Sequence, residues 1–171
     1  DDNSAIPNSD LLCMQQLSSM NTVAIVKDED GIYQRCQFSM IRNSTSGSYE
    51  GHLDQKEELK GNAAMIEDAE YTVIDKLNGF LYFSIGNKLY TYRKGIDECV
   101  EVNLQGVNFD PIVSLNVIAH NDYKANIFVA TYSETNKGKV YRLTPESTDS
   151  RNLTVEEVID TEGAVKCITY W

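Results

Sequence analysis

The sequence is poor in several residue types that define common protein classes. Its 171 residues include three Pro, two His and one Trp. The 15 Lys and Arg residues are outnumbered by 26 Asp and Glu, which gives a formal net charge of −11. A nucleic-acid partner requires clustered cations, so this balance argues against one. No apolar run approaches the roughly 20 residues of a membrane-spanning helix. We therefore expect no transmembrane segment and a soluble chain.

Cysteine is also sparse, with no CxxC pair. The four cysteines are Cys13, Cys36, Cys99 and Cys167. Their spacing does not fit a zinc site, and their number is low for a disulfide framework. Cys36 and Cys99 lie in strand-like runs, where a thiol packs as a small apolar group. The sequence predicts structural thiols, and it points to no metal or cofactor site.

What the sequence does contain is a loose repeat of strand-like segments. Four short runs rich in β-branched residues start at positions 22, 71, 114 and 165, at intervals of 49, 43 and 51 residues. Repeats of about 40–50 residues built from strands are typical of β-propeller blades. The pattern predicts an all-β protein.

The second repeat has the clearest interior. Strand-like runs cover 71–75, 80–85, 89–93 and 99–104, with turns between them. Asn78-Gly79 in the first turn is a strong hairpin signal, because both central positions of this turn need positive φ. Four strands joined by three short turns make one blade.

The other repeats follow the same plan less closely. In the third, strands are expected at 114–119, 126–132, 139–143 and 153–159, with a longer loop over 144–152. In the first, a turn at Asp28–Gly31 joins strands at 23–27 and 32–41, a polar loop covers 43–51, and 56–59 is a helical turn or a degenerate outer strand. We expect a single propeller segment over 1–171, with blades at about 20–61, 69–105 and 112–160 and a closing strand at 164–171.

Three blades are too few for a ring, since propellers typically have four to eight. The favoured interpretation is a segment of a larger propeller. Two alternatives stay open: closure with a second copy, or a short fourth blade in which Leu11–Leu17 joins Val165–Tyr170. An open array would expose strand edges and invite self-association.

Three stretches resemble a known family. Leu81–Tyr92 (LYFSIGNKLYTY), Ile127–Tyr132 (IFVATY) with the following Lys137–Tyr141, and Glu162–Tyr170 are similar to blade motifs of the PKD-like family lipoproteins of Bacteroidetes. The resemblance implies a longer parent with a lipidated N-terminus and immunoglobulin-like domains before the propeller. It also implies a cell-envelope location (outer-membrane surface or periplasm), often beside nutrient-uptake proteins. The lipobox cysteine and the upstream domains are not in this sequence, so membrane anchoring is not carried over. The family offers no catalytic residues to map.

Few residues are candidates for chemistry. His52 lies in a polar stretch without the second histidine that a metal site needs. Ser114, His120 and Asp122 can be written as a triad, but no nucleophile motif supports it. Asp28–Gly31 resembles the start of a calcium loop, yet the distal Glu is missing and an Asp-Gly turn explains the pattern. Gly86-Asn87-Lys88 lacks the spacing of a phosphate loop.

The tyrosines alternate along the predicted strands, as residues on a buried face do. The set is Tyr82, Tyr90, Tyr92, Tyr132 and Tyr141. Alternation favours packing between blades over stacking on a sugar. Asn43-Ser44-Thr45 and Asn152-Leu153-Thr154 match glycosylation sequons, and in a bacterial protein we interpret both as accidental.

The function expected from the sequence is that of a non-catalytic binding or scaffolding module. Its partners would be outer-membrane uptake proteins or a glycan. One alternative is part of a propeller hydrolase or lyase whose active site lies in blades outside this sequence. Another is a purely structural, dimerising domain.

Overall fold

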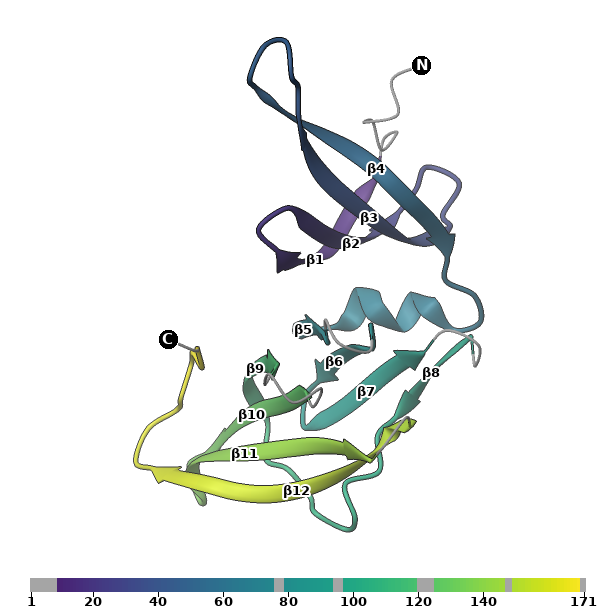
Figure 1. Ribbon diagram of the computed structural model, residues 1–171. Coiled ribbons are helices and arrows are strands. Elements are labelled where there is room, and N and C mark those ends of the chain that lie inside the picture. Colours follow the sequence, from purple (N-terminus) through teal and green to yellow (C-terminus); the bar gives the residue numbers. More distant parts are fainter. Residues whose placement is uncertain (1–8, 76–78, 94–96, 120–124, 147–148, 170–171) are drawn as a thin grey trace. The chain divides into compact units, whose positions relative to one another are not determined.

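The chain is an all-β protein in two compact units. The computed structural model describes residues 9–75, 79–93, 97–119, 125–146 and 149–169. The units are Asp1–Glu67 and Asp68–Trp171. Within the described ranges lie three four-stranded antiparallel sheets, each with its strands in sequence order (Figure 1). No helix in this part of the chain has the length and apolar character to cross a membrane.

The first sheet of the second unit follows the sequence prediction closely. Its strands are β5 (Tyr71–Ile74), β6 (Leu81–Ile85), β7 (Lys88–Arg93) and β8 (Glu98–Glu101). Gly79 has φ +70°, the conformation that the predicted Asn-Gly turn requires. Its partner Asn78 lies outside the described residues, as do 76–77 and most of the turn predicted at 94–98.

The second sheet of this unit has longer outer strands than predicted. Its strands are β9 (Ile112–Ala119), β10 (Ala125–Ser133), β11 (Lys137–Glu146) and β12 (Asp149–Thr161). The loop predicted over 144–152 is largely strand, because Thr144 pairs with Thr154 and Pro145 with Leu153. Leu153 is fully buried. Because burial of this side chain holds β12 against β11, the ladder between the two strands continues into the polar stretch.

The two sheets of the second unit share one hydrophobic core. Val73, Tyr82 and Leu89 of the β5–β8 sheet pack with residues of the β9–β12 sheet, among them Val129 and Leu143. The first strands, β5 and β9, are neighbours in this packing. Phe109, from the connection between the sheets, packs on Tyr141 with ring centroids 4.8 Å apart. Face-to-face burial of this kind is how each sheet hides its apolar side.

The first unit contains a sheet that begins earlier than the sequence predicts. Its strands are β1 (Asp10–Ser18), β2 (Asn21–Lys27), β3 (Tyr33–Arg42) and β4 (Tyr49–Glu58). The start expected near residue 20 is wrong, because β1 pairs along β2 as the first strand. In this sheet Thr22–Val26 therefore belongs to the second strand, whereas 71–75 and 114–119 belong to first strands. The pairing with β2 also replaces the alternative in which Leu11–Leu17 joins Val165–Tyr170.

The outer strand of this sheet is also longer than expected. The polar loop predicted over 43–51 ends at Ser48, and Tyr49–Glu58 pairs with Arg42–Gln34 of β3. The helical turn considered at 56–59 is wrong, and an outer strand is present. Most β4 side chains are exposed, so this edge strand carries little of the apolar alternation that identifies a half-buried strand.

The first unit has a small core of its own. Ala24, Val26 and Cys36 are buried, with Phe38 and Leu53 packed against them. A 3-10 helix, η1 (Ala63–Asp68), follows β4. Glu67 ties this helix to the sheet: its Oε1 accepts hydrogen bonds from Lys27 Nζ at 2.8 Å and from the Tyr33 hydroxyl.

The closing strand predicted over 164–171 does not form in residues 164–169, which have no regular secondary structure. Residues 170 and 171 lie outside the described part. A strand needs a neighbouring backbone in register, whereas here the Asn116 side chain donates to the Ile168 carbonyl at 2.6 Å. In Figure 1 this segment turns back from the end of β12 toward β9.

The cysteines differ in exposure, which predicts selective modification. Cys36 and Cys99 are buried, Cys167 is exposed, and none of the four forms a disulfide. Burial raises the pKa of the Cys99 thiol to about 11 and also raises that of Cys36. We expect a thiol reagent at pH 8 to modify Cys167 in the native protein, and Cys36 and Cys99 only after unfolding, because the thiolate is the reactive form.

Timed labelling with a chromogenic disulfide reagent, with and without denaturant, measures this order. The control variant Cys167→Ser should lack the rapid phase. Rapid native labelling of Cys99 would contradict the buried position.

Candidate functional site

The residues that the sequence singled out for chemistry are dispersed. His52 is a half-buried residue of β4, opposite Ser39 of β3. Ser114 is buried in β9, while His120 and Asp122 lie outside the described residues. In the described ranges no three His, Cys, Asp or Glu side chains are grouped to hold a metal ion.

The loop that resembled a calcium site is closed by its own hydrogen bonds. Asp28 accepts bonds from the backbone N–H groups of Asp30 at 3.1 Å and Ile32 at 2.9 Å, and from the Gln34 amide. Gly31 has φ +78°, which an L side chain rarely adopts. The Asp28 carboxylate is thus used to shape the β2–β3 turn.

This turn predicts a measurable acid sensitivity. The Ile32 N–H is the main group that holds the pKa of Asp28 below its ordinary value of 3.8, helped by the Gln34 amide. Because the folded-state pKa is lowered, the stabilisation is complete above pH 3.8 and is lost as the pH falls through the lowered pKa. NMR titration of the Asp28 carboxyl carbon and the Ile32 amide should give a midpoint below 3.8, and a midpoint at or above it would contradict the bond. Asp28→Asn keeps an acceptor oxygen and should abolish the titration.

The tyrosines serve mainly in packing, as the alternation predicted. Tyr82, Tyr92 and Tyr141 are buried. Tyr90 is half-buried and stacks on Phe83, with ring centroids 5.5 Å apart. Tyr132 is half-buried and donates a hydrogen bond to Glu134 at 3.1 Å.

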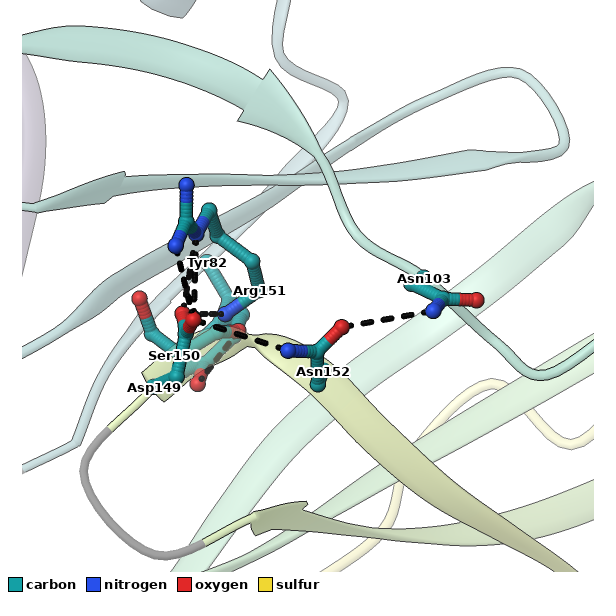
Figure 2. Close-up of polar contacts among 6 residues, drawn as sticks. All are labelled: Tyr82, Asn103, Asp149, Ser150, Arg151 and Asn152. Atoms are coloured by element: carbon teal, nitrogen blue, oxygen red, sulfur yellow. Dashed lines mark hydrogen bonds and ion pairs between the residues drawn. The ribbon is translucent and has the colours of Figure 1, made fainter.

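A polar junction joins the two sheets of the second unit (Figure 2). We use this name for Tyr82, Asn103 and Asp149–Asn152. Asn103, just after β8, donates its N–H to the Arg151 carbonyl at 2.6 Å and accepts from Leu153 N–H at 3.1 Å. These bonds form a parallel bridge between Asn103 and Asn152. The Tyr82 hydroxyl donates to the Ser150 carbonyl at 3.2 Å inside the core.

The charged side of the junction fixes the start of β12. Arg151 donates to both Asp149 oxygens, with Nε at 2.9 Å from Oδ1 and Nη2 at 2.8 Å from Oδ2. The pKa of Arg151 is raised by this bond. Asn152 donates from Nδ2 to Asp149 Oδ2 at 3.5 Å. Asp149, Arg151 and Asn152 therefore bond to one another within β12, whereas Asn103 and Tyr82 supply the hydrogen bonds between the sheets. The junction as a whole holds the two sheets together.

Sequence reasoning missed this junction because it lies within the predicted loop 144–152. The signal that was present is an Asp-Ser-Arg-Asn run followed at once by alternating Leu153 and Val155. Such a run is also typical of an exposed turn. Its partner Asn103 lies 49 residues from Asn152 along the chain, so the local sequence does not reveal the pairing.

A shallow cleft of about 310 Å³ lies at the β11–β12 end of the second unit. Its lining residues are Asn136, Lys137, Gly138, Lys139, Asp160, Thr161 and Glu162. Lys139 Nζ is paired with Glu157 at 2.9 Å and Asp160 at 3.3 Å. The cleft therefore presents cations and carboxylates together with the Asn136 amide and the Thr161 hydroxyl.

Comparison with protein-family models, with curated proteins and with solved structures finds no match for this chain.

Proposed function

We propose that this chain is a β-propeller segment that acts as a non-catalytic binding or scaffolding module. The observation that carries the proposal is the repeated strand order: three sheets, each a four-stranded antiparallel meander, follow one another along the chain. A propeller blade is such a meander, and blades are joined in tandem.

The packing within the second unit supports the same architecture. The β5–β8 and β9–β12 sheets bury a common core, and their first strands are neighbours. In a propeller, first strands line the central axis and successive blades pack face to face. The polar junction adds hydrogen bonds between the two sheets to their apolar contacts.

The binding role rests on how polar groups are used. The Asp28 turn and the polar junction hold strands in place, while the cleft beside Asn136 and Lys137 presents polar groups to solvent. A glycan is the ligand class we propose, because the amide, hydroxyl, ammonium and carboxylate groups that line this cleft are donors and acceptors for sugar hydroxyls. The resemblance to envelope lipoproteins extends the proposal to a cell-envelope location beside nutrient-uptake proteins.

A glycan array probed with the purified chain tests this function. We expect binding to at least one polysaccharide class, reduced by Asn136→Ala and retained in the control Asn62→Ala, which alters an amide outside the cleft. Capture of defined outer-membrane uptake proteins on the immobilised chain tests the scaffolding role. A lack of binding in both assays would contradict the proposal.

A further inference from the structure

The β9–β12 sheet has a second face, turned away from the shared core. Ile127, Val129, Tyr141 and Leu143 point into that core. Because side chains alternate along a strand, the residues between them lie on the opposite face, which we call the outer face.

One cross-strand row of the outer face has an uneven exposure. Ser114, Ala130, Val140 and Ile159 are paired in succession across β9, β10, β11 and β12. Ser114 is 6% exposed, Ala130 0% and Val140 3%, yet Ile159 is 52% exposed. Other atoms of the chain therefore cover Ser114, Ala130 and Val140, whereas Ile159 at the end of the row is open to solvent.

The segment 163–169 is anchored on both sides of this row. At one side, a Cβ on Gly138 of β11 would collide with the Thr161 hydroxyl and with the Gly163 carbonyl oxygen, so the segment starts directly over this glycine. The Thr161 hydroxyl donates to the same carbonyl at 2.6 Å. At the other side, Asn116 Nδ2 of β9 donates to the Ile168 carbonyl at 2.6 Å.

The length of the segment fits a direct crossing. Asn116 lies across from Phe128 and Arg142, so it is four residues along and two strands across from Gly138. At about 3.4 Å per residue and about 4.8 Å per strand, the diagonal is roughly 17 Å. Five extended residues from Gly163 to Ile168 span roughly 17 Å. The two lengths agree, so a nearly straight path between the anchors would lead over Ala130 and Val140.

We propose that residues 163–169 form a strap that covers the outer face of the β9–β12 sheet and keeps it from packing against a second copy of this chain. The opposite face of this sheet is buried against the β5–β8 sheet. With the strap lifted, Ala130 and Val140 would join Ile159 in an apolar surface on a sheet whose last strand is β9, a combination that promotes association between sheets.

The contacts of the strap allow it to leave the sheet as one segment. Residues 164–169 belong to no strand ladder, and Lys166 and Cys167 are exposed. Its Gly138 and Asn116 anchors can be changed singly without altering the core face of the sheet. This inference does not depend on the propeller proposal, because it concerns one sheet and its own segment.

Two pairs of variants test the strap. Gly138→Ala forces the added methyl against the Thr161 hydroxyl and the Gly163 carbonyl oxygen that this hydroxyl bonds, whereas Gly163→Ala meets nothing within 4 Å and serves as its control. Asn116→Asp replaces the donor to Ile168 but keeps the oxygen that accepts Val117 N–H at 2.8 Å. Its control is Asn126→Asp, which adds the same charge to the same face and keeps the acceptor of the Thr144 hydroxyl at 3.1 Å.

Backbone NMR relaxation and light scattering on the full chain give the two readouts. In Gly138→Ala and Asn116→Asp we expect the order parameters of the 164–169 amides to fall below those of the wild type, to less than about 0.6, the range of a flexible backbone. The average molecular mass should rise with protein concentration above that of the wild type. Both controls should match the wild type. Unchanged order parameters would show that the segment is not held at these anchors, and lower order parameters without added association would show that it does not shield the face. Either result overturns the proposal.

Discussion

Replacing Tyr82 with Ala is expected to destabilise the second unit by about 4 kcal/mol, a typical cost of removing a fully buried aromatic side chain. Tyr82 is 0% exposed and belongs to the core shared by the two sheets. Its hydroxyl also reaches the Ser150 carbonyl of the other sheet. The substitution therefore leaves a cavity between the sheets and removes a bond across them.

Urea unfolding followed by circular dichroism measures this loss as a lower midpoint. Tyr82→Phe is the matched control, because it keeps the ring and removes the hydroxyl, at a cost of about 1 kcal/mol. A midpoint for Tyr82→Ala close to that of the wild type would show that the two sheets do not share this core.

Val129→Asp is expected to prevent folding of the second unit. Val129 is 0% exposed at the centre of the β9–β12 sheet, on the face toward the shared core. An unpaired carboxylate buried there costs several kcal/mol or takes up a proton. That penalty, added to the lost apolar contacts, is comparable with the total stability of about 5–15 kcal/mol that domains have.

The control for Val129→Asp is Ile159→Asp, which places the same charge on the same sheet at a half-exposed position. Amide NMR spectra of the two variants give the measurement. We expect collapse of the dispersed β-sheet resonances in Val129→Asp and their retention in Ile159→Asp. A dispersed spectrum for both would contradict the packing of this sheet.

The second and third sheets could be predicted because their strands carry the local signals of strands. Runs such as Leu81–Ile85 and Ile127–Tyr132 are rich in β-branched and aromatic residues, and short turns set their limits. The start of the β1–β4 sheet was predicted one strand too late, because its first strand lacks these local signals. Its first strand, Asp10–Ser18, is rich in Leu, Met and Gln, which favour strands less, and it is recognised only through its pairing with β2.

The contacts that matter most for the site are long-range. Asn103 meets Asn152, and Asn116 meets Ile168, across 49 and 52 residues of chain. The segment 164–169 is rich in β-branched residues, and the sequence predicts a strand there. The structure instead gives residues 164–169 no strand ladder, and the described contacts at the ends of the segment are side-chain and glycine contacts.

A crystal structure of the full chain would test whether the four-stranded sheets pack as blades, as we propose. We expect β5 and β9 to lie side by side along a common axis, and their two sheets to twist outward from it with Tyr82 and Tyr141 in one core. Two sheets stacked as a sandwich, with the strands of both aligned within about 30° along their whole length, would contradict the claim.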